Sequence, residues 1–227
     1  VVWATLDRNM GRAAIKSFFV PKGSPGMQLV RLDKKLGIRA SDTAVLSFND
    51  CRIPKDNILG SPEIDTKKGF GGVMQTFDNT RPIVAAMALG VARASLEVTE
   101  TFLKEAGVDT RMRGSRWTQH AATAELHRMK AELEAARLLT LKAAWMADNG
   151  IPNSVEASMA KAKAGRTANE VTLRCVELCG GTGYGETELL EKWARDSKIL
   201  DIFEGTQQIQ LLIVARNLLG LKSTELR

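Results

Sequence analysis

The sequence predicts an α+β protein in which the end of a β domain precedes a bundle of long helices. Four of the six prolines and several short apolar runs lie before residue 65, which is typical of strands and turns. No proline occurs between Ile83 and Ile151 or after Pro152, and apolar residues recur there at steps of three and four, which predicts amphipathic helices. We therefore divide the chain into residues 1–65 and residues 66–227.

Four strands are expected in the first part. They are the segments VVWATL, AIKSFFVP, MQLVRL and TAVLSFNDCRIP, separated by turn residues such as PKGSPG. Residues 45–50 of the last segment alternate in character, as expected of a sheet with two unlike faces. The first strand already starts at residue 1 and no initiator Met precedes it, so we expect the chain to begin inside a larger protein.

The first long helix is expected to start at DNTRP, with Pro82 in its first turn, where the missing N–H costs nothing. Its apolar stripe should consist of Val84, Met87, Val91, Ala94 and Val98. A second helix is expected from Trp117 to Ala147, with the stripe Leu126, Met129, Leu133 and Ala136.

A third helix should follow DNGIPN, where Asn153 and Glu156 have the spacing of a capping box, and should stop at Gly180 and Gly181. Two shorter helices are expected at about 186–195 and 205–219. Long helices with short connections pack as an up-and-down antiparallel bundle.

The composition limits the kinds of ligand and the cellular location that we expect for this protein. The net charge of +6 favours an anionic ligand such as a phosphate-bearing cofactor. Nucleic-acid binding is disfavoured because no zinc-finger spacing exists and one Tyr and seven Phe provide no stacking platform. No apolar run approaches the roughly 20 residues of a membrane span, and no signal peptide is visible.

The three cysteines favour a reducing compartment, hence a cytoplasmic protein, or one of the mitochondrial matrix in a eukaryote. Cys175 and Cys179 share a helix face, but buried Cys more often packs as a small hydrophobe than binds metal, so no metal site is expected. His120 and His127 favour no hydrolytic arrangement.

Three segments are candidates for a functional site. GGTGYG (180–185) follows a helix rather than a strand, so it is not a dinucleotide fingerprint; a helix end and tight turn explain it, although its glycines also allow close approach of a ligand. FDNTRP offers Asp78 and Arg81 around an expected helix start, either as a cap or as an anion site.

Glu204, in ILDIFEGTQQIQ, is by spacing alone an acidic residue in the first turn of a helix. The apolar residues before it favour the alternative, a carboxylate facing an apolar pocket and acting as a base.

Four motifs, in order, resemble the acyl-CoA dehydrogenase family: LGIRASDTAVLSFNDCRIPKDNILG, FDNTRPIVAAMALGVA, LCGGTGYGE and RDSKILDIFEGTQQIQLLIVAR. The similarity extends from about residue 10 to residue 220. It implies a partial antiparallel β domain followed by an up-and-down four-helix bundle. The family's N-terminal helices and first β segment, which supplies much of the flavin-ring contact, have no counterpart in this sequence.

The resemblance implies that Glu204 abstracts the α-proton of an acyl-CoA thioester while the β-hydrogen leaves as hydride to FAD, giving a trans-2-enoyl-CoA. Relatives that carry the base on the first bundle helix have it where this chain has Thr80, which cannot serve. In the family the thioester oxygen is held by the backbone N–H of the catalytic Glu and a flavin hydroxyl.

Further site residues follow from the same resemblance. Asp78, Arg81 and Gly205 match acyl-CoA contacts, Thr206, Gln208 and Gln119 match FAD contacts, and Gly180 and Gly181 match the turn that touches the FAD of a neighbouring subunit. The implied partners are an electron-transfer acceptor such as a flavoprotein and further subunits, in a homo- or hetero-oligomer that is a dimer or a tetramer, such as a homotetramer. The implied process is β-oxidation of fatty acids.

Two departures concern the FAD. An R-x-x-F-G run, whose Arg meets the FAD pyrophosphate across the subunit boundary, is replaced by GVDTRMRGSRWTQ, in which Arg111, Arg113 or Arg116 could compensate. Glu177 stands where Gln is common, and its charge could repel phosphates. The alternatives left open are a non-catalytic, FAD-contacting assembly subunit and a flavin acyl-CoA oxidase. The acyl chain length and the electron acceptor are not readable from the residues.

Overall fold

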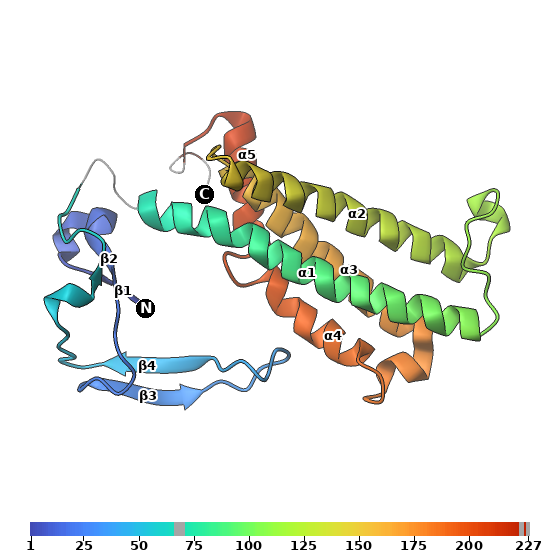
Figure 1. The fold of residues 1–227 in the computed structure, drawn as a ribbon, viewed down its shortest axis with the longest axis horizontal. Helices are drawn as coiled ribbons and strands as arrows, with labels where there is room; N and C mark the ends of the chain where they lie inside the picture. Colours follow the sequence, from blue (N-terminus) through green and yellow to red (C-terminus); the bar gives the residue numbers. More distant parts are fainter. Residues whose placement is uncertain (66–70, 223–224, 226–227) are drawn as a thin grey trace. The chain divides into compact units, whose positions relative to one another are not determined.

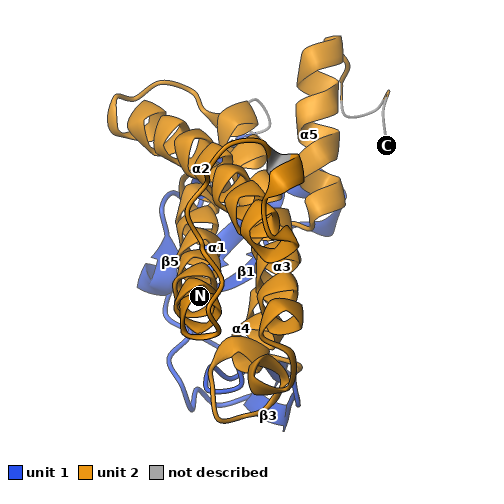
Figure 2. Ribbon diagram, turned by 90° about the vertical axis from the view of Figure 1, so that its right-hand side faces the viewer, with its two compact units in different colours: residues 1–35, 39–76 blue, residues 36–38, 77–227 orange. Residues whose placement is uncertain are grey.

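The protein comprises two compact units in a computed structural model that describes residues 1–65, 71–222 and 225. One unit contains residues 1–35 and 39–76, and the other contains residues 36–38 and 77–227 (Figure 2). The side chains of residues 71–73 and 116 also lie outside the description. The expected contribution of Arg116 therefore cannot be placed.

The first unit holds two small antiparallel sheets. One has the order β1 (Val2–Thr5), β2 (Ile15–Phe18) and β5 (Ile58–Leu59), and the other pairs β3 (Met27–Leu32) with β4 (Ala44–Phe48). Two short 3-10 helices, η1 (Arg8–Ala14) and η2 (Lys55–Asn57), lie between strands. The four predicted strands are confirmed, whereas the two-residue β5 is too short to leave a periodic signal.

The alternation predicted for the last of these strands is also confirmed. Val45 and Ser47 are half-buried while Leu46 and Phe48 are exposed. Successive side chains of a strand point to opposite faces, so β4 shows one covered face and one open face.

The second unit is the helical bundle. Its three long helices are α1 (Gly71–Glu105), which belongs to this unit from Phe77 on, α2 (Ala121–Asp148) and α3 (Ser154–Tyr184). They lie side by side and alternate in direction (Figure 1). The shorter α4 (Leu190–Ser197), the 3-10 helix η4 (Lys198–Asp201) and α5 (Gln207–Leu219) complete it. Another 3-10 helix, η3 (Arg116–Thr118), precedes α2. The predicted fold class is confirmed.

Small residues fill the bundle core. The buried set includes eleven positions from the three long helices: Val84, Ala88, Ala92, Leu96, Leu126, Met129, Ala136, Ala157, Ala160, Ala164 and Ala168. Alanine at these positions lets the helix axes approach closely. The stripe predicted for α2 is confirmed, but Met87, assigned to the α1 stripe, is 47% exposed. The actual α1 stripe passes through Ala88 and Ala92, because alanine gives a weaker periodic signal than methionine.

Helix α1 begins earlier than predicted. It starts at Gly71, so Pro82 lies inside it and not in its first turn. Pro82 supplies no N–H to the carbonyl of Asp78, four residues earlier. The segment FDNTRP is therefore not a helix start, and neither a cap nor an anion site at a helix N-terminus describes it.

Three other helix ends also differ from the prediction. His120 is the N-cap of α2, where its Nδ1 accepts from the N–H of Ala122 at 3.2 Å, so that helix begins after the predicted Trp117. Asn153 is the N-cap of α3, but its side chain donates to the carbonyl of Ala143 at 2.9 Å, so the predicted capping box does not form. Gly180 interrupts α3 with φ +56°, yet one more helical turn continues to Tyr184.

Helix α1 is long and apolar enough over Met74–Glu105 to pass for a membrane span by length and composition. Core helices of folded domains pass the same test. One face of α1 is buried in the bundle core through Val84, Ala88, Ala92 and Leu96.

The turn formed by residues 36–38 packs against α4 within the second unit. Ile38 N–H donates to Oδ1 of Asp196 at 2.6 Å, and Nη1 of Arg195 donates to the Leu36 carbonyl at 3.0 Å. A Cβ on Gly37 would lie 2.4 Å from the Arg195 carbonyl oxygen. Only glycine permits this approach of the two backbones.

Candidate active site

Glu204 lies in the loop between η4 and α5 and not in a helix. Its φ is +57°, a conformation that is uncommon for a residue with a side chain, and Gly205 follows with φ +90°. Thr206, not Glu204, is the N-cap of α5, and its hydroxyl accepts from the N–H of Ile209 at 3.4 Å. The interpretation of Glu204 as a helix-start carboxylate is therefore wrong. Strained backbone of this kind persists only where the surroundings hold it.

One of those surroundings is Thr80 on α1. Its hydroxyl donates to Oε2 of Glu204 at 2.8 Å, although 124 residues separate the two in the sequence. This bond engages one carboxylate oxygen and so fixes the rotation of the carboxylate. Thr80 has no carboxylate of its own, but it orients the carboxylate of Glu204.

Asp78 and Arg81 form an ion pair on the same stretch of α1. Nη1 of Arg81 lies 2.6 Å from Oδ1 of Asp78, and it also donates to Oγ of Ser158 at 3.4 Å. Arg81 is only 3% exposed. Burial lowers the pKa of its guanidinium, while the Asp78 and Glu204 carboxylates oppose that shift. Its charge thus acts from inside the bundle and not from an open surface.

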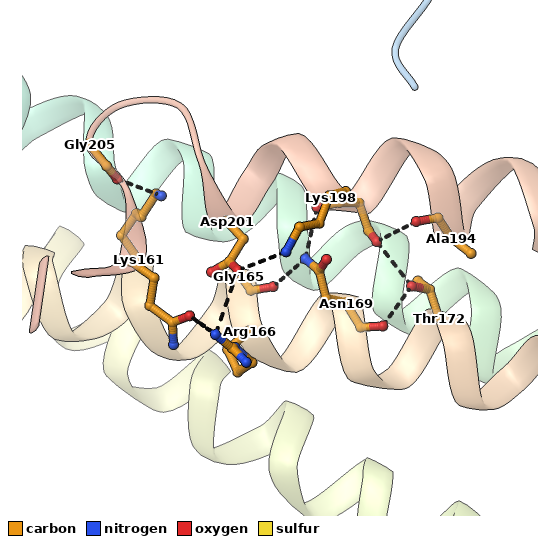
Figure 3. A network of polar contacts seen from close by, with 11 residues as sticks. Lys161, Gly165, Arg166, Asn169, Thr172, Ala194, Lys198, Asp201 and Gly205 are labelled. Atoms are coloured by element: carbon orange, nitrogen blue, oxygen red, sulfur yellow. Dashed lines mark hydrogen bonds and ion pairs between the residues drawn. The ribbon is translucent and has the colours of Figure 1, made fainter. Parts of the chain in front are cut away.

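Two residues that the sequence reading missed hold the backbone of the loop. Nζ of Lys161, on α3, donates to the Gly205 carbonyl at 2.8 Å (Figure 3). Nε2 of Gln210, on α5, donates to the carbonyls of Glu204 and Gly205 at 3.0 and 3.1 Å. Lys161 is 1% exposed and Gln210 is fully buried. A Cβ on Gly205 would lie 2.5 Å from Nε2 of Gln210, so this position requires glycine.

Lys161 could have been noticed from the sequence. It shares the third helix's stripe of small residues with Ala157, Ala164 and Ala168, where a lysine is unexpected because charged side chains are rarely buried without a partner. Gln210 gives no comparable signal. Its buried position follows only from the way α5 packs against the loop.

A polar network around the buried Asp201 and Asn169 continues from the loop along α3 and η4 (Figure 3). Oδ2 of Asp201 lies 3.4 Å from Nζ of Lys198 and 3.9 Å from Nη2 of Arg166. Nδ2 of Asn169 donates to the carbonyls of Gly165 and Ser197 at 2.8 and 3.0 Å. These bonds fix η4, and with it the start of the loop that carries Glu204.

The remaining predicted residues divide between two places. Thr206 and Gln208 lie directly after the Glu204 loop, and the side chain of Gln208 is exposed. Gln119, Gly180 and Gly181 lie at the opposite end of the bundle, where α1, α2 and α3 are joined or end (Figure 1). Gly180 is nineteen positions after Lys161 on α3, which is about 28 Å at 1.5 Å per residue. One chain therefore does not bring all of the predicted residues together.

That distant end is open and positively charged in part. A hollow of about 430 Å³ is lined by residues of the α1–α2 connection, among them Arg111, Arg113, Gln119 and His120. Arg111 and Arg113 both lie within ion-pair distance of Asp109, at 2.8 and 3.5 Å. Oε1 of Gln119 is buried and has no hydrogen-bond partner among the described residues.

The glycine-rich turn at this end leaves its backbone accessible. A Cβ added at Gly180 or Gly181 would meet nothing within 4 Å. Glu177, where the sequence raised the question of repulsion, forms an ion pair with Arg174 that offsets its charge. Burial raises the pKa of the Cys175 thiol to about 12, so this thiol stays neutral and packs as a small apolar group. Cys179 is buried as well.

A metal centre is not indicated by the side chains that can be placed. Within residues 1–65, 71–222 and 225, no group of three or more His, Cys, Asp or Glu residues is arranged to hold an ion. The ring of His127 contacts the Thr110 carbonyl at 2.9 Å, and His120 caps α2. Both histidines are thus locally bonded, as the sequence indicated.

Comparison with known proteins gives consistent relatives. Residues 67–219 match the family model described as acyl-CoA dehydrogenase, C-terminal domain. The chain is 41% identical over 220 residues to the mitochondrial short-chain specific acyl-CoA dehydrogenase of Bos taurus, and the match covers 96% of this chain and 52% of the bovine protein.

Two solved structures have the same fold over nearly the whole chain. Butyryl-CoA dehydrogenase from Megasphaera elsdenii is 36% identical with a TM-score of 0.84, covering 96% of this chain and 55% of that one. A structure solved in work on the electron transferring flavoprotein of Acidaminococcus fermentans is 37% identical with a TM-score of 0.85, covering 96% and 56%. The chain spans about half the length of the curated relatives it matches.

Proposed function

The chain belongs to the acyl-CoA dehydrogenase family, and we propose that it supplies the base and part of the flavin site for FAD-dependent α,β-dehydrogenation of an acyl-CoA thioester. The observation that carries this proposal is the Glu204 loop. A carboxylate in strained backbone, bonded to Thr80 at 2.8 Å and backed by buried cations, has the construction of a functional group and not of a surface residue.

Glu204 abstracts the α-proton in this proposal. Thr80 engages Oε2, so the orientation of the carboxylate is fixed before substrate arrives. Such preorganisation matters because a carboxylate is a weak base for a carbon acid and gains rate by position. Glu204 N–H and the Gly205 backbone border the thioester, and the anion that forms needs donors aimed at its oxygen. FAD, when bound, supplies the acceptor for the β-hydride.

Asp78 and Arg81 support this site from α1, on either side of Thr80. The ion pair is nearly buried, so its cationic charge lies close to Glu204 without being offered to solvent. Its contribution to acyl-CoA binding is then to shape the turn that carries Thr80. The cap residue Thr206 and the exposed Gln208 lie directly after the loop, at the start of α5. There they would contact a flavin.

The residues at the other end of the bundle fit the FAD phosphates of a second subunit. Two arginines and open glycine backbone at 180–181 suit a phosphate-bearing ligand, because guanidinium and backbone N–H groups donate to phosphate oxygens. Gly180 lies about 28 Å along α3 from Lys161, whose Nζ contacts the loop that carries the base. The same FAD can therefore be held by both ends only if they come from different chains, which supports a dimer or tetramer.

The substrate and acceptor follow the relatives in this proposal. The bovine protein is named short-chain specific and the Megasphaera enzyme is named for butyryl-CoA, so short acyl thioesters are the first substrates to test. One similar structure comes from work on an electron transferring flavoprotein, and a flavoprotein of that class is the acceptor we propose. The compartment would be a bacterial cytoplasm or a mitochondrial matrix, and the process β-oxidation of fatty acids.

The test uses the complete flavoprotein that contains this chain. Without oxygen, butyryl-CoA should bleach the flavin absorbance, and Glu204→Gln should slow bleaching by about 10⁴-fold, the upper range for a general base. Glu134→Gln, which alters an exposed ion pair with Arg137 on α2, serves as the matched control and should bleach at the normal rate. Normal bleaching by Glu204→Gln would overturn the proposal.

A further inference from the structure

Lys161 has no part in the proposed chemistry, yet it is one of the most completely buried side chains of the protein. It is 1% exposed and lies beneath the loop that carries the base. We infer that Lys161 is a positioning residue for Glu204: by holding the Gly205 carbonyl it keeps the Glu204–Gly205 backbone in the conformation that proton abstraction needs. This inference rests on the proposed role of Glu204.

The geometry of the loop shows why a donor is needed there. Glu204 and Gly205 both have positive φ, +57° and +90°. Two such residues in succession are costly for a chain that carries a side chain at the first. The Gly205 carbonyl receives Nζ of Lys161 at 2.8 Å and Nε2 of Gln210 at 3.1 Å, and Gln210 also bonds the Glu204 carbonyl. The loop is thus held from two helices at once.

The charge of Lys161 is matched by what surrounds it. Asp201 on η4 and Glu204 in the loop favour the ammonium, whereas Arg81 on α1, which is paired with Asp78, opposes it. Asp201 is shared with Lys198 and Arg166. Burial has the largest influence and lowers the pKa of Lys161 to about 8. The amine is therefore mostly charged at neutral pH and becomes neutral a little above it.

Packing alone does not explain a lysine at this position. Burying an ammonium costs free energy unless it is bonded, and methionine would fill the same length without that cost. The neighbouring Lys163 shows the ordinary case on the same helix, because its ammonium forms an ion pair with Glu132 at the surface. Lys161→Met and Lys163→Met therefore make a matched pair that differs in the contact with Gly205.

The experiment measures proton abstraction apart from hydride transfer. A 3-thiaacyl-CoA, in which sulfur replaces the β-carbon, can lose an α-proton to Glu204 but has no β-hydrogen to give. In D₂O the α-C–H bond breaks, the carboxylate takes the proton, and a deuteron returns, which mass spectrometry of the thioester follows. The protein is the complete holoenzyme, with flavin retention and the thermal midpoint recorded for every variant.

Lys161→Met should slow the exchange by about 100-fold, the size expected when a reacting group is misplaced by about 1 Å, while Lys163→Met exchanges at the normal rate. Lys161→Gln, which keeps a shorter N–H donor, should recover about tenfold of that loss, still well within the misplacement range. The normal enzyme should exchange more slowly as pH rises through about 8, and both Lys161 variants should lack this step.

The inference is overturned if Lys161→Met folds, retains flavin and exchanges as fast as the normal enzyme, or if the step near pH 8 persists in it. Should Lys161→Met fail to fold, Lys161→Gln decides: a normal rate with the step retained overturns the inference. Failure of the proposed function looks different. In that case Glu204→Gln exchanges as fast as the normal enzyme, whatever the Lys161 variants do.

Discussion

The two ends of the helical bundle are built in different ways. The base end, formed by Asp78, Thr80, Arg81, Lys161, Glu204, Gly205 and Gln210, is held by buried charges and by bonds to strained backbone. The loop end, formed by residues 106–120 and the turn at 180–185, is held by ion pairs that solvent reaches. Its glycine backbone has open space around it.

This difference shows how much of each site a single chain provides. At the base end, side chains of α1, α3 and α5 bond the single loop that carries Glu204, so this chain itself supplies contacts that orient the carboxylate. At the loop end, the groups suited to a phosphate face outward, and a ligand or second subunit would complete them. The base end should therefore respond strongly to single substitutions, whereas the loop end should respond weakly until flavin or a partner is measured.

The largest expected effect is that of Arg81→Met, which leaves Asp78 without its buried partner. Removing one member of a buried pair is strongly destabilising, and we expect a loss of about 3 kcal/mol in the free energy of unfolding, measured by urea denaturation. Arg137→Met, which breaks the exposed pair with Glu134, is the control and should leave the midpoint unchanged. Equal losses of stability from the two changes would contradict the expectation that the buried ion pair matters more than the exposed one.

Alanine at two glycines compares the ends directly. In Gly205→Ala, the new Cβ meets Nε2 of Gln210 at 2.5 Å and displaces a buried amide, so about 2 kcal/mol of stability should be lost. Gly180→Ala also places a side chain at positive φ, +56°, but meets no neighbour within 4 Å, and should cost about 1 kcal/mol. Thermal unfolding ranks the two, and a larger loss for Gly180→Ala would contradict the comparison.

Thr80→Val tests orientation without changing shape. It removes the hydroxyl that bonds Oε2 of Glu204 and should slow anaerobic flavin reduction by about tenfold, which corresponds to one modest hydrogen bond of about 1.4 kcal/mol. Thr101→Val, whose hydroxyl bonds only a carbonyl of its own helix, is the control. An unchanged rate for Thr80→Val would show that the carboxylate is oriented by other contacts.

The smallest effect concerns Glu100, which anchors the loop end through Lys130, Lys104 and Thr110. The hydrogen bond from Lys130, and after it that from Lys104, lowers the pKa of Glu100 to about 2, against the opposing influence of burial. The carboxyl's ordinary pKa is about 4.5, so its stabilisation is complete above that pH and is lost as pH falls toward 2. With solvent screening it should amount to about 1 kcal/mol.

Acid unfolding monitored by circular dichroism checks this value. Glu100→Gln should flatten the dependence of stability on pH between about 4.5 and 2. Glu134→Gln, at an exposed pair on α2, should change it less. A variant at position 100 that keeps the full acid dependence would show that other carboxylates govern it.

Much of the fold could be predicted because local patterns decide it. Alternating residues predicted β4, and the steps of three and four predicted α2 with its buried Leu126 and Met129. The start of α1 could not be read, because Pro82 favours a first turn by local propensity, whereas the helix starts at Gly71 and passes through Pro82. The interior stripe of α1 was also misread, because alanines carry little hydrophobic signal.

The residues at the centre of the candidate site were predicted, whereas the residues that hold its loop in place were missed. Glu204 and its neighbours Gly205 and Thr206 were recognised from one motif. Lys161 and Gln210 were not recognised, because their role depends on hydrogen bonds to backbone carbonyls of the loop. Patterns of side chains along the sequence do not show such bonds.

By itself, the sequence determined the order of the elements, the family resemblance and the residue that we propose as the base, since these depend on residue types and spacings within segments and on the order of four motifs. Only the tertiary structure decided that Glu204 lies outside a helix, that Thr80 orients it and that Lys161 and Gln210 hold its loop. Only the tertiary structure separated the base end from the loop end. The reason is physical: contacts over 124 residues arise from helix packing, and no local pattern encodes them.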